Sequence, residues 1–315
     1  MLMATGGAGY VGSHAVRALR AAGHEVVAYD DLSEGHADAL LGAPLVQGDI
    51  RDTPRLVAAL REHRVAAVLH FAARCYVGES MEQPDLYWSI NRDGTRSLLE
   101  AMAQAGAGAL VFSSTCAVFG VPERVPMDED LPHRPISVYG QTKAAMELEI
   151  AASGLPHVIL RYFNAAGAAA DGALGERHDP EPHLIPRALR AARDGTELDV
   201  HGGDYPTPDG TCVRDYVHVE DLAAAHVAAV ERLLGGGASL TCNLGYGRGA
   251  SVLQVCDAVR AVTGRPLRTR VGPRRPGDPP ELYARADRAR RELSWQPRFD
   301  DLAVIVRHAW QALRD

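Results

Sequence analysis

The residues best suited to chemistry are a tyrosine and a lysine in the middle of the chain. Tyr139 and Lys143 are four residues apart, so on a helix they would share one face. A free tyrosine has a pKa of about 10, too high for a base at neutral pH, but a neighbouring cation favours the phenolate. Lys143 is the only lysine among 33 Lys and Arg residues. The pair predicts a tyrosine base helped by a compact ammonium that the wide guanidinium fork does not replace.

Three hydroxyl side chains precede this pair. Ser113, Ser114 and Thr115 follow an apolar run and stand at the carboxyl end of the strand expected at 109–113. Open α/β sheets bind their ligands at this edge, so the hydroxyls are placed where a substrate could be met. For Ser114 alone, capping of the following turn is the expected role.

A glycine-rich loop opens the chain. Gly6, Gly9 and Gly12 follow a short strand and begin a helix, in the pattern GxxGxxG. Such a loop allows a tight turn and a close backbone approach to a pyrophosphate at the helix N-terminus. Asp30, about 20 positions further on, suits a ribose hydroxyl, and no Arg or Lys occurs from Asp30 to Ile50 to receive a 2′-phosphate. These features predict NAD rather than NADP, with Asp49 on the adenine amino group.

Alternating strands and helices must position these motifs. Six strands are expected in the first half, at 2–5, 25–29, 44–47, 66–71, 109–113 and 157–161, with helices at 12–22, 53–63, 91–106 and 139–153. This alternation predicts an α/β fold with a Rossmann-like doubly wound parallel sheet. The second half contains Gly/Pro/Asp-rich loops at 167–182 and 202–210 and helices at 221–234, 252–263, 286–293 and 302–313. It predicts a smaller, mixed α/β substrate domain.

Composition excludes several classes of function. The 315 residues carry a net charge of −7 with a pI of about 6.0, which gives no basic footprint for nucleic acid or an anionic membrane. We expect no membrane span and no leader segment. The five cysteines are scattered without a CxxC pair. They predict reduced thiols in a cytoplasmic protein, with neither disulfides nor a metal site.

Several longer segments, taken with these motifs, resemble the UDP-glucose 4-epimerase family of the extended short-chain dehydrogenases/reductases. They are GGAGYVGSH (6–14), FAARCYVGES (71–80), RYFNAAGA (161–168), DYPTPDGTCVRDYVHVEDLAAAH (204–226) and RRPGD (274–278). The resemblance implies an NAD-binding domain at 1–168 and a UDP-sugar domain at 169–315, with the segment around 212–234 packing back on the first. It also implies a homodimer packed through helices that include the one bearing Tyr139 and Lys143.

The resemblance further implies a role for each site residue. Tyr139 would be the base, Lys143 would bind the nicotinamide ribose, and Thr115 would hydrogen-bond the sugar 4-hydroxyl. The NAD site would comprise Gly6, Gly9, Tyr10, Val11, Gly12, Asp30, Ser33, Asp49, Ile50, Phe71, Ala72, Ala73, Asn91, Ser113, Tyr139, Lys143 and Tyr162. The substrate site would comprise Thr115, Asn164, His183, Leu184, His201, Arg214, Arg275 and Asp278, with His201 against the uracil.

The chain departs from the family pattern at several positions. Cys75 stands where some members have a lysine, and Phe119 replaces a common tyrosine. His201 and His183 stand where other members have an aromatic residue and an asparagine. Leu282 is smaller than the tyrosine that closes the sugar pocket elsewhere, so UDP-N-acetylhexosamines could fit.

Other functions remain as alternatives. Nucleotide-sugar 4,6-dehydratases and UDP-glucuronate decarboxylases need a carboxylate just after the threonine, where this chain has Cys116 and Ala117. A 4-epimerase of another nucleotide sugar, such as a UDP-N-acetylhexosamine, a UDP-hexuronate or a dTDP-sugar, is less well excluded. A non-catalytic NAD-binding sensor would not need the Tyr139–Lys143 pair.

Overall fold

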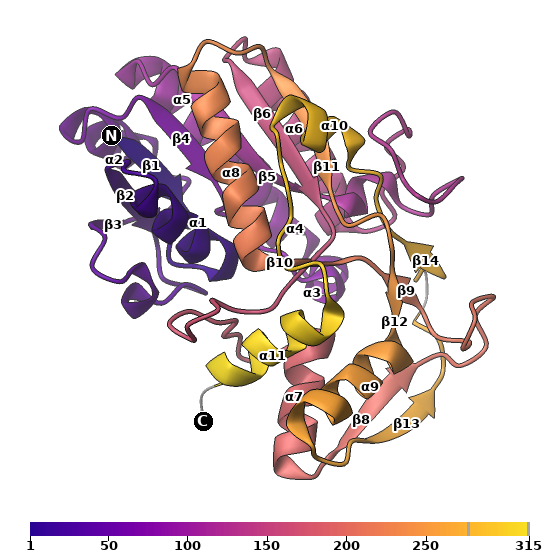
Figure 1. Cartoon of the computed structure of the whole chain (residues 1–315). Coiled ribbons are helices and arrows are strands. Elements are labelled where there is room, and N and C mark those ends of the chain that lie inside the picture. The colour runs from indigo at the N-terminus through magenta and orange to yellow at the C-terminus, as the bar shows by residue number, and fades with distance from the viewer. Residues whose placement is uncertain (276–277, 314–315) are drawn as a thin grey trace.

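The computed structural model describes residues 1–275 and 278–313. Its centre is a seven-stranded sheet in which neighbouring strands are all parallel, in the order β11-β6-β5-β4-β1-β2-β3 (Figure 1). The strands are β1 Leu2–Thr5, β2 Val26–Asp30, β3 Leu45–Gln47, β4 Ala67–His70, β5 Ala109–Thr115, β6 His157–Tyr162 and β11 Leu240–Leu244. The predicted doubly wound parallel sheet is confirmed.

Successive residues of the central strands enter two separate hydrophobic cores, one on each face of the sheet. Leu2 and Ala4 of β1 belong to one core, whereas Met3 between them belongs to the other. Because side chains alternate across a strand, a sheet that is covered on both faces needs apolar residues in both registers. Continuous apolar runs in the sequence therefore became central strands.

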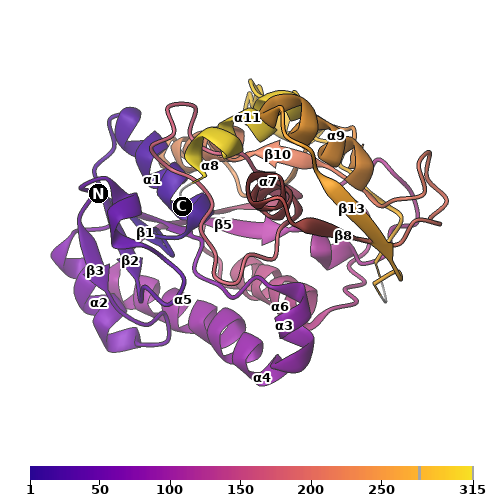
Figure 2. The ribbon, with the colours of Figure 1, turned by 90° about the horizontal axis from the view of Figure 1, so that it is seen from below.

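Helices cover both faces, as the view in Figure 2 shows. On one face lie α1 (Tyr10–Ala21) and α8 (Val219–Leu234), which pack against each other. On the other face lie α2 (Thr53–Glu62), α5 (Gly94–Ala105) and α6 (Val138–Ala152). Although α8 and β11 come from the second half of the sequence, both belong to this layered unit.

The rest of the second half forms a smaller α/β lobe at one end of the sheet (Figure 1). The hydrophobic core of this lobe, the third in the molecule, lies between α7 (Leu184–Asp194), α9 (Val252–Thr263) and α11 (Leu302–Ala312). Short strands complete it: the parallel pair β8 (Glu197–His201) and β13 (Arg268–Gly272), the pair β7 (Asn164–Ala166) and β10 (Tyr216–His218), and the sheet of β12 (Ala250–Ser251), β9 (Val213–Arg214) and β14 (Glu281–Leu282).

Short helical segments fill the connections. They are η1 (Ala37–Leu40), α3 (Val77–Glu82), α4 (Pro84–Tyr87), the π-helical η2 (Trp88–Asp93), η3 (Cys116–Phe119) and α10 (Asp287–Glu292). Across the described ranges, no helix combines the length and the apolar character needed to cross a membrane.

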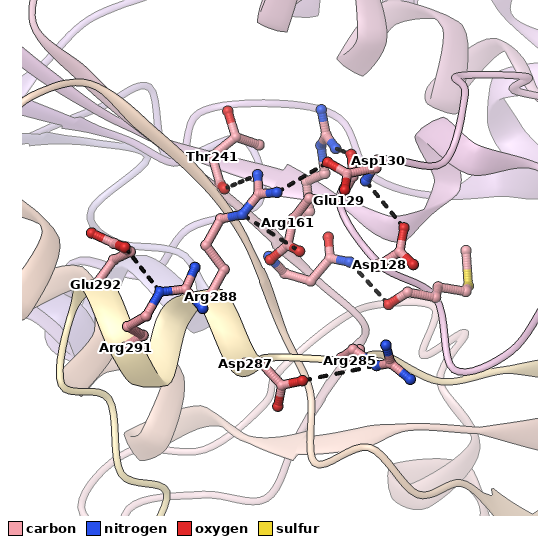
Figure 3. A network of polar contacts seen from close by, with 12 residues as sticks. Asp128, Glu129, Asp130, Arg161, Thr241, Arg285, Asp287, Arg288, Arg291 and Glu292 are labelled. Atoms are coloured by element: carbon pink, nitrogen blue, oxygen red, sulfur yellow. Dashed lines mark hydrogen bonds and ion pairs between the residues drawn. The ribbon is translucent and has the colours of Figure 1, made fainter.

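The loop between η3 and α6 is anchored to the C-terminal part of the chain. The Met127 N–H donates to the Tyr283 carbonyl at 2.8 Å, and the Met127 carbonyl accepts from the Arg285 N–H at 2.6 Å. Figure 3 shows Arg288 of α10 between this loop and β11, where it donates to the Asp130 carboxylate at 3.0 Å and to the Thr241 carbonyl at 3.3 Å. These contacts fix the approach to α6.

Candidate active site

Helix α6, which carries Tyr139 and Lys143, begins beside the end of β5. Ser137 is its N-cap, and the Ser137 hydroxyl accepts a hydrogen bond from the Gly140 N–H at 3.1 Å. A Cβ on Gly140 would lie 2.6 Å from the Ala117 carbonyl oxygen, so only glycine permits this close approach. The first turn of α6 thereby places Tyr139 near Thr115, whose side chain influences the pKa of the phenol.

The side-chain ammonium of Lys143 lies in the interior of the protein. Its side chain is buried, its ammonium donates to the Ser113 carbonyl at 2.9 Å, and Nζ lies 4.8 Å from the centre of the Phe112 ring. Burial lowers the pKa of Lys143 to about 8, although Cys75 and Glu147 act in the opposite direction. An ammonium has three N–H donors, and the bond to Ser113 uses one of them.

Tyr139 is not activated by the protein alone. Burial, followed by the nearby Cys75 and Tyr162, raises the pKa of Tyr139 well above its usual value, while the hydrogen bond with Thr115 lowers it. The help expected from the Lys143 cation does not outweigh this desolvation. A further positive charge beside the phenol would favour the phenolate form.

The three hydroxyls at the end of β5 make different contacts. Ser113 is hydrogen-bonded to the Tyr162 hydroxyl, and Thr115 accepts from the Ala117 N–H at 3.2 Å as the N-cap of η3. The capping role expected for Ser114 is wrong, because its hydroxyl donates to Glu147 of α6 instead. Ser114 therefore fastens α6 to β5.

The glycine loop forms a cradle that side chains would fill. Gly6 has φ +69°, and a Cβ there would lie 2.5 Å from the Ala72 nitrogen after β4. A Cβ on Gly12 would lie 2.2 Å from the Gly6 carbonyl oxygen. Gly9 is the N-cap of α1 and provides no side-chain cap, so the N–H groups of the first turn face an open position. This cradle fits a dinucleotide pyrophosphate.

Asp30 joins the glycine loop to the end of β2. Its carboxylate accepts from the Ala8 N–H and the Leu32 N–H, each at 2.9 Å. Burial raises the pKa of Asp30, and these two hydrogen bonds oppose that effect. A carboxylate can accept about four hydrogen bonds, so capacity remains for a ribose hydroxyl.

Most of the predicted cofactor residues meet at one edge of the sheet. The parallel strands β1 to β6 end there, and the strand order reverses between β1 and β4, which is where this class of sheet binds dinucleotides. The residues at or just after these strand ends, or in the first turn of α1, are Gly6, Gly9, Tyr10, Val11, Gly12, Asp30, Ser33, Asp49, Ile50, Phe71, Ala72, Ala73, Ser113 and Tyr162.

Three of the predicted cofactor residues, Ser33, Asp49 and Asn91, form polar contacts with other residues of the protein. The Ser33 hydroxyl donates to Asp31 at 2.7 Å, and Asp49 forms an ion pair with Arg51. Asn91, in η2, is fully buried: it accepts from the Arg74 N–H at 2.8 Å and donates to Thr142 at 3.0 Å. Asn91 thus holds the loop after β4 against α6.

The predicted substrate-binding residues that can carry charge lie in the smaller lobe. Arg214 on β9 is ion-paired with Asp278, and Leu282 on β14 is the register partner of Arg214. His201, at the end of β8, interacts electrostatically with Arg275 and Asp278; burial, followed by Arg275, lowers its pKa. Of the predicted RRPGD segment, residues 276 and 277 lie outside the described residues.

The other predicted substrate residues lie at the entry to the smaller lobe. Asn164 is exposed on β7, where its N–H donates to the Asp215 carbonyl at 3.0 Å. His183 is the N-cap of α7 and Leu184 is the first residue of that helix. The His183 side chain faces Glu176, with Nδ1 2.6 Å from a carboxylate oxygen.

The departures from the family pattern have distinct surroundings. Cys75 is exposed and interacts electrostatically with both Tyr139 and Lys143, so it belongs to the same site. Phe119 is buried, with the Arg161 guanidinium 5.1 Å from its ring centre.

Several supporting residues escaped the sequence-based prediction. Glu147 of α6 and Arg161 of β6 form a buried ion pair at 2.6 Å. Asp215 accepts from the backbone N–H groups of Tyr246 and Gly247, and Asp221 from those of residues 298 and 299. Asp215 and Asp221 lie in the quoted 204–226 segment, but each follows another charged residue, Arg214 or Glu220, so no local signal distinguished it.

Known proteins share this architecture. The model of the NAD dependent epimerase/dehydratase family matches residues 2–245. A UDP-glucose 4-epimerase of Rhizobium meliloti (strain 1021) is 48% identical over 314 residues, covering 98% of this chain and 95% of the relative. The crystal structure of UDP-glucose 4-epimerase from Brucella ovis in complex with NAD is 47% identical, with a TM-score of 0.96 and coverage of 98% of this chain and 97% of that chain. A UDP-glucose-4-epimerase from Stenotrophomonas maltophila with bound NAD and formylated UDP-arabinopyranose is 43% identical, with a TM-score of 0.95 and coverage of 99% and 97%.

Proposed function

This chain belongs to the NAD dependent epimerase/dehydratase family, and on that premise we propose that it is an NAD-dependent 4-epimerase that interconverts UDP-glucose and UDP-galactose. The observation that carries the proposal is the position of Tyr139 near Thr115, on the first turn of α6 and four residues before the buried ammonium of Lys143. These groups stand at the same sheet edge as the glycine cradle and Asp30. An acid/base group next to a dinucleotide site is what reversible oxidation of a sugar hydroxyl requires.

The cofactor would be held by residues from several strand ends. The Gly6–Gly12 loop would receive the pyrophosphate and Asp30 the adenosine ribose, while the remaining donors of Lys143 would serve the nicotinamide ribose. Bound NAD would supply the hydride acceptor and donor for the sugar C4, a chemistry that no side chain provides.

Tyr139 would move the proton of the reaction. Its phenolate oxygen would accept the proton of the sugar 4-hydroxyl as a transient 4-keto sugar forms, and would return that proton afterwards. Thr115 would hydrogen-bond the same hydroxyl and orient it. Burial raises the pKa of Tyr139, so a cation bound beside it would favour the phenolate.

The smaller lobe would hold the UDP group while the hexose turns over. Arg214 and Arg275 are suited to a diphosphate because the guanidinium fork matches phosphate oxygens. Arg214 is ion-paired with Asp278, so a diphosphate would compete for it with this carboxylate. We propose that His201 lies against the uracil and that His183, Leu184 and Asn164 complete the site.

Two wider assignments complete the proposal. We propose a cytoplasmic homodimer that packs through helices including α6, consistent with apolar side chains exposed on α3 and α6.

The carboxylate that dehydratases and decarboxylases need is absent, since Cys116 and Ala117 follow Thr115. Leu282, next to Arg214 in register, leaves UDP-N-acetylhexosamines as a second substrate class.

The test is turnover by the purified protein without added cofactor. UDP-glucose, UDP-N-acetylglucosamine, UDP-glucuronate and dTDP-glucose are incubated separately, and the products are resolved by chromatography. We expect UDP-galactose from UDP-glucose, and a decrease in kcat of about 10²–10⁴-fold for Tyr139→Phe with little change in UDP-sugar affinity. Activity that survives in Tyr139→Phe would remove Tyr139 as the base. Absence of any epimer, even with NAD supplied, would favour another sugar or a sensor.

A further inference from the structure

We propose that Glu176, His178, Glu181 and His183 form a binding site for one divalent transition-metal cation of the Zn²⁺ class. These residues lie in the loop between β7 and α7, and one potential ligand atom from each lies within 4.8 Å of the others. The site is separate from the Tyr139–Thr115–Lys143 group and would not take part in the redox step. The scattered cysteines predict no metal site, but histidines and carboxylates are metal ligands as well.

The spacing of the ligand atoms is close to that of a tetrahedral site. Bonds of about 2.0–2.2 Å to a tetrahedral ion place neighbouring ligand atoms about 3.3–3.6 Å apart. His178 Nδ1 lies 3.3 Å from Glu176 and 3.6 Å from Glu181, and His183 Nδ1 lies 3.2 Å from Glu181. Only the His183–Glu176 separation, at 2.6 Å, is shorter and would have to widen slightly.

The imidazole nitrogens of the cluster face carboxylates without hydrogen bonds of good geometry. Within the described part of the chain, His178 Nδ1 and His183 Nδ1 are buried and make no hydrogen bond of good geometry, although both face the Glu176 carboxylate. Of the Glu181 carboxylate, Oε1 accepts from the His183 N–H at 3.0 Å and Oε2 makes no hydrogen bond with the described residues. The Glu181 side chain is only 2% exposed and that of Glu176 only 6%. An unpartnered polar atom at this depth is costly, and a cation that accepts all these lone pairs would remove the cost.

The charge of the cluster and its mixed nitrogen and oxygen ligands suit a divalent cation such as Zn²⁺. Two buried carboxylates bring two negative charges, which one divalent ion balances while both imidazoles stay neutral. Two imidazoles and two carboxylates supply N₂O₂ ligands, a set that suits Zn²⁺ better than Mg²⁺ or Ca²⁺, which prefer oxygen alone. Four protein ligands also leave no open position, so the site would be structural rather than catalytic.

The position of the cluster indicates what the ion would stabilise. The same loop reaches the N-terminal half through ion pairs of Asp171 with Arg17 and of Arg177 with Asp38. The His178 ring makes edge contacts with the rings of Tyr10 and Tyr76, with centroids 6.5 Å and 5.7 Å apart. A bound cation would therefore fix this loop between the glycine cradle and the start of α7.

Metal content measures the proposal independently of epimerase activity. The full-length protein is stripped with a chelator, loaded with Zn²⁺ or Co²⁺, passed through a desalting column and analysed for bound metal. We expect one equivalent of Zn²⁺ in the wild type and the intense visible absorption of tetrahedral Co²⁺. His178→Ala and the nearly isosteric Glu181→Gln should each weaken binding by on the order of 100-fold. Circular dichroism and gel filtration establish that both variants are folded.

An exposed His–Glu pair provides the matched control. His24 lies 3.3 Å from Glu231 at the surface, so His24→Ala removes an imidazole beside a carboxylate outside the cluster. This variant should keep one equivalent of metal, and Zn²⁺ should raise its melting temperature as in the wild type. A wild-type protein that retains no metal would overturn the proposal. So would equal retention by folded His178→Ala and Glu181→Gln, because the ion would then be adventitious.

Discussion

At the scale of single residues, Lys143 combines a functional position with a cost in stability. Its ammonium is buried, and the protein lowers its pKa from 10.5 to about 8. A shift of this size corresponds to a destabilisation of the folded state by about 3 kcal/mol. Replacing Lys143 would also remove its hydrogen bond to the Ser113 carbonyl, which would lower stability by about 1–1.5 kcal/mol. We therefore predict that Lys143→Met abolishes epimerase activity yet raises the free energy of unfolding of NAD-free protein at pH 7 by about 1–2 kcal/mol. Urea unfolding followed by circular dichroism measures this difference.

The pH dependence of that difference identifies its cause. Between pH 8 and pH 10.5 the unfolded state binds the Lys143 proton and the folded state does not, so this residue makes stability rise with pH in that window. Below about pH 8 the penalty is complete and constant. The advantage of Lys143→Met should accordingly shrink from pH 8 to pH 10.5. An advantage that does not change with pH, or a less stable variant, would contradict the account of a buried cation.

At the scale of elements, the contact of α6 with the turn after β5 can be tested with glycines. Alanine is favoured over glycine within helices by about 1 kcal/mol, but a Cβ on Gly140 would lie 2.6 Å from the Ala117 carbonyl and 3.0 Å from Pro135. We predict that Gly140→Ala lowers the free energy of unfolding by about 1–3 kcal/mol and lowers kcat, because Tyr139 moves away from Thr115. Chemical denaturation and steady-state rates give both quantities.

Gly78 in α3 is the matched control. A Cβ there would meet no atom within 4 Å, so Gly78→Ala should be neutral or slightly stabilising. If the two substitutions changed stability alike, helix propensity alone would decide the outcome, and the close contact at Gly140 would not matter.

The elements that the sequence predicted are those whose signal is local. Strands β1, β2, β4, β5 and β6 are short, largely apolar runs buried on both faces. The glycine loop and the Tyr139–Lys143 pair each lie within a few consecutive residues. The missed elements lack such signals. Strand β11 carries the polar Thr241 and Asn243, β13 is largely exposed and rich in arginine, and α7 has Pro186 in its first turn.

In the site, too, the residues with a local sequence signal were predicted and those that depend on long-range contacts were not. Glu147 and Arg161 are meaningful only as a pair, and folding brings them together from α6 and β6. The capping role expected of Ser114 was wrong because Glu147, from a distant segment, competes for its hydroxyl. Local sequence patterns do not contain such long-range pairings.

At the scale of the whole molecule, the two halves of the chain are interleaved. The second half returns β11 to the edge of the central sheet and α8 to the layer beside α1. The loop before α6 is in turn bonded to residues 283–288 near the C-terminus. The sheet therefore needs both halves of the sequence, and the site depends on the contact between them.

The exposed apolar side chains on α3 and α6 lead to the last prediction. Val77, Met81 and Leu148 are 51%, 58% and 67% exposed, and α3 packs against α6 (Figure 2). Apolar side chains gathered on a surface in this way indicate a partner, and for a homodimer that partner is a second copy. We predict that the wild type is a dimer in light scattering and that Leu148→Glu weakens dimerisation by about 100-fold or more. Leu234→Glu, at a position 48% exposed at the end of α8, should remain dimeric. A monomeric wild type, or a dimer that tolerates glutamate at position 148, would exclude α6 from the interface.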